Sequence, residues 1–147
     1  MRELRLARYQ AGLYTLLAML VLIAPLCGLL FDCGCTWPWQ GLDSHCNIHN
    51  PEAAHQCPWC ASVLMGTISV GLAFLVGFLL AMKPIKSSYD VRDSAMAGVQ
   101  RISITAELVK RVLVGMLGFF IVAVITGWLS GYVQEYPYFF LVGGGSV

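Results

Sequence analysis

Residues 32–60 form a hydrophilic segment between two long apolar stretches, and they read D-C-G-C-T-W-P-W-Q-G-L-D-S-H-C-N-I-H-N-P-E-A-A-H-Q-C-P-W-C. This segment contains five of the six cysteines, all three histidines, and neither lysine nor arginine. The cysteines occur as a C-x-C pair, a single residue and a C-x-x-C pair. Such a concentration of soft and borderline metal ligands indicates that any chemistry of this protein takes place here.

The composition around this segment is typical of a membrane protein. Of the 147 residues, 58% are hydrophobic and 12% are charged, whereas soluble domains have about a quarter charged residues. Apolar stretches at about 11–30, 61–82 and about 112–132 are each long enough for a membrane-spanning helix, which needs about 20 residues. We therefore predict an all-α integral membrane protein, one membrane domain with three transmembrane helices, in which the Cys/His-rich segment 31–60 joins the first helix to the second.

The distribution of positive charge predicts the orientation. Every basic residue either precedes the first span or lies in the segment 83–111, and these residues are Arg2, Arg5, Arg8, Lys83, Lys86, Arg92, Arg101, Lys110 and Arg111. Because basic segments stay cytoplasmic, we expect the N-terminus inside a bacterial inner membrane and both 31–60 and the tail 133–147 outside. Within the predicted cytoplasmic loop 83–111, segment 85–111 is expected to form a short surface helix that turns into the third span. The net charge of +1 gives no indication of nucleic-acid binding, and the lipid bilayer is the expected partner.

The spans themselves offer little chemistry. Their interiors contain no carboxylate, histidine, lysine or arginine, so we expect no membrane-embedded catalysis and do not expect an enzyme. Cys27, inside the first span, is interpreted as a small apolar residue. Trp37, Trp39 and Trp59 fall at the predicted bilayer boundary, where indoles are favoured. Small residues recur in the later spans and predict close helix packing, within the chain or with other membrane subunits: Ser69, Ala73 and Gly77, then Ala123, Gly127 and Gly131.

The first hypothesis for segment 32–60 is a metal site for metal handling, or in an accessory subunit of a membrane complex. Thiolate and imidazole ligands select copper(I), zinc or an iron–sulfur cluster. Tetrahedral zinc would bind Cys33, Cys35, Cys57 and Cys60. A second, weaker site would use Cys46, His45, His49 and His55. Copper is favoured for an exposed periplasmic segment, because mixed cysteine and histidine ligation suits both storage and transfer, so the predicted cofactor is copper or zinc.

The second hypothesis is thiol–disulfide redox chemistry at Cys57-Pro58-Trp59-Cys60. A C-x-x-C pair at the start of a helix has a lowered thiol pKa. This pair and the helix after it resemble the first periplasmic loop of the disulfide-bond-forming quinone reductases, which implies electron transfer to a quinone. The resemblance is confined to these residues, since the basic residue after the pair, the fourth span and the second cysteine loop of that family are absent.

The third hypothesis is a structural role. Disulfides would staple the segment, each contributing about 2–4 kcal/mol, and the protein would be an accessory subunit of a larger membrane complex. Five cysteines cannot all pair within the segment, so Cys46 would be left over.

Overall fold

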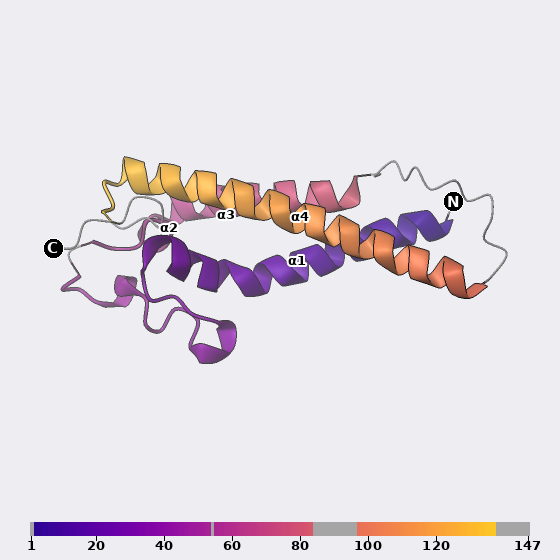
Figure 1. Cartoon of the computed structure of the whole chain (residues 1–147). Helices are drawn as coiled ribbons and strands as arrows, with labels where there is room; N and C mark the ends of the chain where they lie inside the picture. Colours follow the sequence, from indigo (N-terminus) through magenta and orange to yellow (C-terminus); the bar gives the residue numbers. More distant parts are fainter. Residues whose placement is uncertain (1, 54, 84–96, 138–147) are drawn as a thin grey trace.

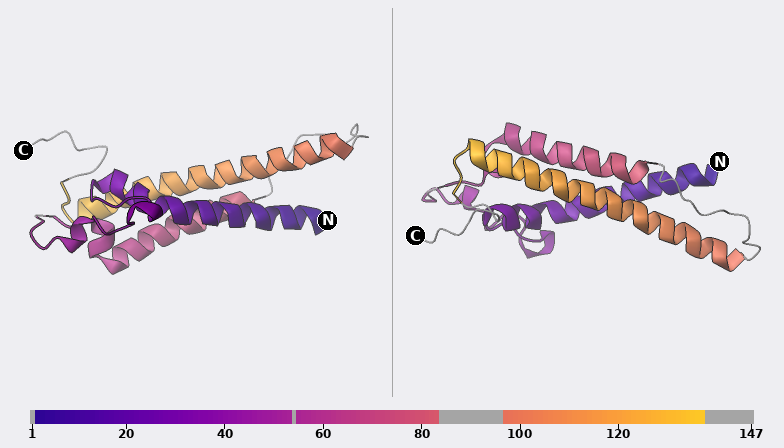
Figure 2. Two further views of the ribbon diagram at one scale, coloured as in Figure 1. Left: turned by 90° about the horizontal axis from the view of Figure 1, so that it is seen from below. Right: turned by 45° about the horizontal axis from the view of Figure 1, so that its top comes forward.

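The computed structural model describes residues 2–53, 55–83 and 97–137, and within these ranges it contains helices and no strand (Figure 1). In chain order the elements are α1 (Arg2–Phe31), the 3-10 turns η1 (Pro38–Gln40) and η2 (Asn47–His49), α2 (Pro58–Ala61), α3 (Val63–Met82) and α4 (Ala97–Val133). The three long helices α1, α3 and α4 lie side by side (Figure 2). The short elements η1, η2 and α2 lie at the end of this bundle away from the N-terminus.

Three segments of the long helices are apolar enough to cross a membrane: Arg8–Phe31, Val63–Met82 and Thr105–Val133. Large apolar side chains also cover their outer faces, as Leu13, Leu72 and Leu117 show with exposed fractions of 56%, 45% and 61%. A helix that is apolar on all sides suits a hydrocarbon environment. The prediction of an all-helical protein with three candidate spans is therefore confirmed for the part of the chain that the structure describes.

Helix α4 is longer than the sequence analysis expected. It runs without a break from Ala97 to Val133, where a short surface helix turning near residue 112 was predicted. Neither proline nor glycine occurs between Gly98 and Gly115, so no residue in that interval interrupts the helical hydrogen bonds.

Arg111 fixes the pairing of α3 and α4 at the end of the bundle far from the cysteines. Its side chain is buried, and it forms an ion pair with Glu107 one turn earlier in α4, with Nη2 2.9 Å from Oε1. Its Nη1 also donates to the carbonyl oxygen of Lys83, at 2.9 Å, just beyond the end of α3. A buried guanidinium thus has partners on both helices, as a charge removed from water requires.

Small residues bring α3 and α4 together along their length. Gly77 and Gly115 approach so closely that a Cβ on Gly115 would lie 2.8 Å from the carbonyl oxygen of Gly77. Nearer the cysteines, the buried hydroxyls of Ser69 and Ser130 form a hydrogen bond of 3.1 Å. Ala73 is also fully buried. The small residues of α3 therefore serve packing within this chain, one of the two roles predicted for them.

A short break between α2 and α3 sets the position of the C-P-W-C pair. Ser62 has an extended backbone, and its Oγ accepts a hydrogen bond from the backbone N–H of Met65 at 3.4 Å, which caps the start of α3. The bend turns Trp59 inward, where it is buried and packs edge-on against Phe31 with ring centroids 5.3 Å apart. Trp59 is thus part of the core of the chain, and its place at the bilayer boundary stays a prediction.

Candidate metal centre

All six cysteines gather at one end of the helical bundle. Cys27 lies one turn before the end of α1, and Cys33 and Cys35 lie in the non-helical segment that follows it. Cys46 precedes η2, and the last two cysteines are the N-cap and the third residue of α2. Five of the thiols are buried and Cys60 is half-buried. Four separate parts of the chain thus supply sulfur to one place.

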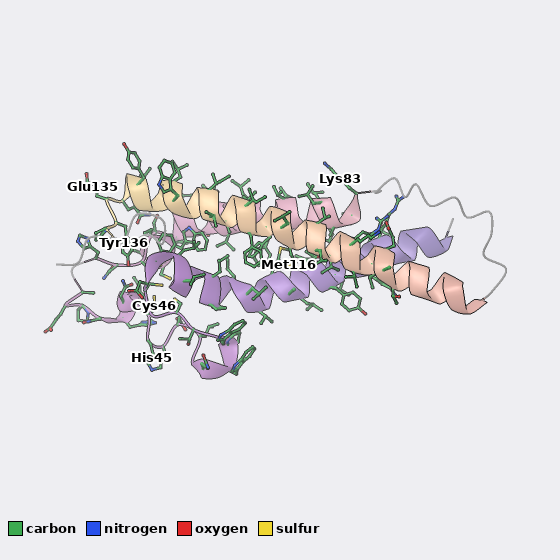
Figure 3. The ribbon with its side chains drawn as sticks, viewed as in Figure 1. His45, Cys46, Lys83, Met116, Glu135 and Tyr136 are labelled. Atoms are coloured by element: carbon green, nitrogen blue, oxygen red, sulfur yellow. The ribbon has the colours of Figure 1, made fainter. Side chains whose placement is uncertain are left out.

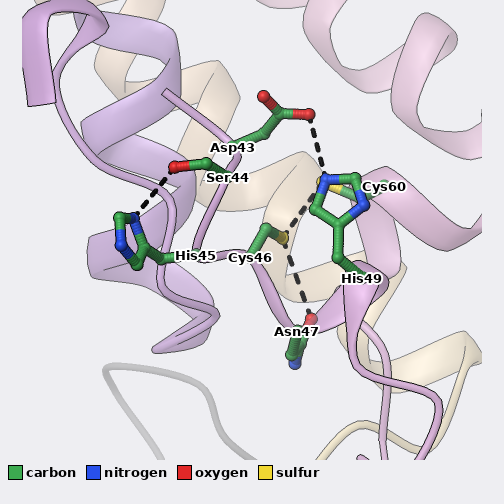
Figure 4. A network of polar contacts seen from close by, with 7 residues as sticks. All are labelled: Asp43, Ser44, His45, Cys46, Asn47, His49 and Cys60. Atoms are coloured by element: carbon green, nitrogen blue, oxygen red, sulfur yellow. Dashed lines mark hydrogen bonds and ion pairs between the residues drawn. The ribbon is translucent and has the colours of Figure 1, made fainter. Parts of the chain in front are cut away.

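The sulfur atoms are close enough to share metal ions. The Sγ atom of Cys27 lies 3.3 Å from that of Cys57 and 3.7 Å from that of Cys33. The Sγ atoms of Cys46 and Cys60 lie 3.8 Å apart (Figure 4). Three groups of three have all their sulfurs within 4.8 Å of one another: Cys27, Cys57 and Cys60; Cys27, Cys33 and Cys35; and Cys35, Cys46 and Cys60.

These distances match metal–thiolate geometry. With metal–sulfur bonds of about 2.3 Å, the sulfurs lie about 4.0 Å apart around a trigonal ion and about 3.8 Å apart around a tetrahedral one. The measured separations of 3.3–3.8 Å lie close to both values. Small side-chain rotations therefore suffice to coordinate an ion, so the cluster is able to hold a metal.

Cys27 is the candidate ligand that the sequence analysis missed. It was interpreted as an ordinary apolar residue of the first span, yet it belongs to two of the three groups of sulfurs. The reason is that α1 ends only at Phe31, and the chain then folds back over its last turn. The only sequence signal was the short distance along the chain from Cys27 to Cys33.

Two glycines allow the chain to fold back. A Cβ on Gly28 would overlap the carbonyl oxygen of Cys35, so the C-x-C segment passes directly over the end of α1. Gly34, between the two cysteines, has a φ of +84°, a conformation that glycine adopts without strain. A Cβ there would also overlap the carbonyl oxygen of His45. Both positions require glycine for the C-x-C pair to reach Cys27.

Asn47 connects the parts of the cluster that are distant in sequence, and the sequence analysis did not identify it. Its backbone N–H donates to the carbonyl oxygen of Cys33 at 2.8 Å. Its Oδ1 accepts a hydrogen bond of 2.9 Å from the backbone N–H of Cys57. Its Nδ2 donates to the carbonyl oxygen of His55 at 3.0 Å and to the hydroxyl of Tyr136 at 3.2 Å.

Tyr136 completes this network from the end of α4. Its hydroxyl donates to the carbonyl oxygen of Phe31, the last residue of α1, at 2.8 Å. Burial raises the pKa of Tyr136 to about 12, so the phenol stays protonated and remains a donor at neutral pH. The cysteine cluster is therefore held by α1, η2, α2 and the end of α4 together.

Replacing Asn47 with alanine should destabilise the cluster even without metal. The backbone N–H of Cys57 would lose its acceptor and the carbonyl oxygen of His55 its donor, at a cost of about 2 kcal/mol in unfolding free energy. Denaturant unfolding of the reduced protein in detergent, followed by tryptophan fluorescence, measures this cost. Asn50→Ala is the matched control, because Asn50 is exposed and its side chain accepts only a local hydrogen bond from the backbone of Glu52. Equal stabilities of the two variants would contradict the role of Asn47.

The histidines lie outside the sulfur cluster. His45 contacts the hydroxyl of Ser44 through Nδ1 at 3.0 Å, and His49 contacts the carboxylate of Asp43 through Nε2 at 3.3 Å (Figure 4). All three are exposed, and the ring of His55 packs edge-on to Tyr136 at 6.3 Å between centroids. Among the described residues, no histidine belongs to a group that could hold a metal. Cys46, grouped with the histidines as a second-rank candidate, instead joins Cys35 and Cys60.

Contacts between the thiols and burial shift the pKa values of the cysteines in opposite directions. The Cys27 thiol is the largest cause that lowers the pKa of Cys33, of Cys57 and of Cys60, because a hydrogen bond from its single S–H stabilises whichever of these thiolates accepts it. Burial raises the pKa of Cys46 to about 12. The helix N-terminus invoked for the C-x-x-C pair adds little, because α2 has only four residues.

All six thiols are free, so the structure gives no support to disulfide stapling. Comparison with protein-family models, with curated proteins and with solved structures finds no match. The geometry of the cysteine cluster is therefore the basis for the function proposed below.

Proposed function

We propose that this protein is a small membrane protein that binds a soft metal ion, copper(I) above zinc, through its cysteine cluster. The observation that supports this proposal is the convergence of six thiols, five of them buried, from four parts of the chain. The buried thiols also pack as small apolar side chains in the core, and thiolates gathered at such short distances bind soft metals strongly. The role is metal handling, alone or as an accessory subunit of a membrane complex.

The ligand set favours copper(I) over zinc. Each group offers three sulfurs and no nitrogen or oxygen. Structural zinc sites take four ligands in a tetrahedron, whereas copper(I) accepts trigonal coordination by thiolates, the softest ligands that proteins offer. The sequence analysis expected copper to bind both cysteine and histidine. We propose instead that only sulfur atoms bind it.

We place the cluster on the outer side of a bacterial inner membrane. Lys83 lies at the opposite end of the bundle from Cys46 (Figure 3), and the segment 32–60 contains no basic residue. Basic segments stay in the cytoplasm, so this orientation directs the cysteines outward, into a compartment through which copper passes. The lipid bilayer is the partner of the outer helix faces, and any further subunit would contact those faces.

Thiol–disulfide exchange is the second candidate, and one distance favours it. The Sγ atoms of Cys27 and Cys57 are only 3.3 Å apart. Oxidation of these two thiols would form one disulfide and release two protons and two electrons to an acceptor such as a membrane quinone. The reactive pair would then be Cys27 with Cys57, in place of Cys57 with Cys60.

Metal counting separates the two functions. The reduced chain, purified in detergent without oxygen, is loaded with copper(I), desalted and analysed for copper per chain. We expect at least one firmly bound ion, and the same amount in a variant with His45, His49 and His55 all replaced by alanine. Absence of copper from the reduced wild-type chain, and of zinc when zinc is loaded in the same way, would reject the metal site and leave thiol–disulfide exchange.

A further inference from the structure

The three groups of sulfurs are linked by shared members. Cys27, Cys35 and Cys60 each belong to two groups, whereas Cys33, Cys46 and Cys57 each belong to one. Any two of the shared cysteines occur together in one group, so their three sulfurs also lie within 4.8 Å of one another. The shared sulfurs thus form an inner triangle, and each edge of that triangle has one outer sulfur beside it.

The three groups that include an outer sulfur define three metal positions of the same kind. Each position is surrounded by two inner sulfurs and one outer sulfur, which is a trigonal set. We propose that the cluster binds three copper(I) ions in a ring, in which Cys27, Cys35 and Cys60 bridge neighbouring ions and Cys33, Cys46 and Cys57 bind one ion each. This inference rests on the proposed metal-binding function, and it specifies the number of ions and the role of every cysteine.

Sharing of sulfurs also reduces the charge that must be buried. Three separate trigonal sites would need nine thiolates, and the chain has six cysteines. Three monovalent ions on six thiolates leave three negative charges, against six for separate sites. Buried charge without a partner is costly, and residues 32–60 contain no lysine or arginine to offset it. Loading of six thiols with three ions releases six protons, so acid favours the empty cluster.

The ring makes a prediction within each cysteine pair. In the C-x-C pair the first residue, Cys33, is terminal and the second, Cys35, bridges. In the C-P-W-C pair Cys57 is terminal and Cys60 bridges. Within each pair, replacement of the bridging cysteine by serine should therefore remove more bound ions than replacement of the terminal cysteine.

The test is native mass spectrometry of the reduced chain in detergent, titrated with copper(I) in the absence of oxygen. We expect three ions in the wild-type chain, two in Cys33→Ser and in Cys57→Ser, and one in Cys35→Ser and in Cys60→Ser. Each terminal variant is the matched control for the bridging variant of its pair. Helicity by circular dichroism shows which variants remain folded.

Each other outcome overturns a defined part of the inference. A single ion in the wild-type chain would reject the ring and leave the metal-binding function standing, whereas no ion would reject both. Equal losses within each pair would reject the division into bridging and terminal cysteines. If the variants do not fold, X-ray absorption of the copper-loaded wild-type chain decides: shared thiolates give a short copper–copper scattering path, and its absence would overturn the ring.

Discussion

Replacement of Cys27 by serine should remove most of the bound copper, although this residue lies in the first apolar span. The Sγ atom of Cys27 is within 3.3 Å and 3.7 Å of the sulfurs of Cys57 and Cys33, and it belongs to two of the three groups. A serine hydroxyl is a hard ligand with little affinity for a soft ion, so we expect retention of about a third of the copper or less. Copper per chain after desalting measures the effect.

Ala24→Ser is the matched control for this substitution. Ala24 lies on α1 one turn before Cys27 and is half-buried, so its replacement adds a hydroxyl to the same helix without removing a sulfur. This variant should bind as much copper as the wild-type chain. Full copper binding by Cys27→Ser, with normal helicity, would exclude Cys27 from the site. The metal would then be bound by the five cysteines of segment 32–60.

Replacement of Gly28 by alanine should weaken copper binding although it removes no ligand. The new Cβ would overlap the backbone carbonyl of Cys35, which is not the movable end of a flexible side chain. The C-x-C segment would have to move away from α1, and overpacking of this kind costs about 1–3 kcal/mol. If the substitution destabilises the copper-loaded cluster by this amount relative to the empty one, copper affinity decreases about tenfold to a hundredfold.

Gly71→Ala provides the comparison. A Cβ at Gly71, in α3, would meet no atom within 4 Å, so the substitution changes a glycine in a long helix without touching the cluster. Competition against a copper(I) chelator of known affinity measures both variants under one condition. We expect Gly71→Ala to match the wild-type chain, and equal affinities for the two variants would show that the C-x-C segment does not need to pass over Gly28.

The three apolar helices were predictable because hydrophobicity is a local property of the chain. A run of about 20 apolar residues identifies a candidate span without reference to the rest of the molecule, and Val63–Met82 corresponds closely to the predicted stretch 61–82. The start of α4 was not predictable in the same way. Polar residues near Lys110 suggested a surface segment, whereas the absence of any helix-breaking residue let the helix continue to Ala97.

The type of chemistry could also be inferred from the sequence, but the membership of the site could not. The C-x-C and C-x-x-C pairs indicated soft-metal ligands, and all of their cysteines lie in the cluster. The histidines carried the same signal in the sequence and lie outside it. Residue type shows which atoms are able to bind a metal, whereas only the path of the chain decides which of them meet.

By itself the sequence determined three apolar helices and a cysteine-rich segment between the first two, because the hydrophobic effect and ligand chemistry act residue by residue. The tertiary structure alone decided that Cys27 joins the site and that Asn47 holds it together. These two results depend on contacts that form only in the folded chain: the return of the C-x-C segment over Gly28, and the hydrogen bonds that Asn47 accepts from the backbone of Cys57 and donates to Tyr136. Such contacts form only when α1, α2 and the end of α4 are packed together, and no local pattern encodes them.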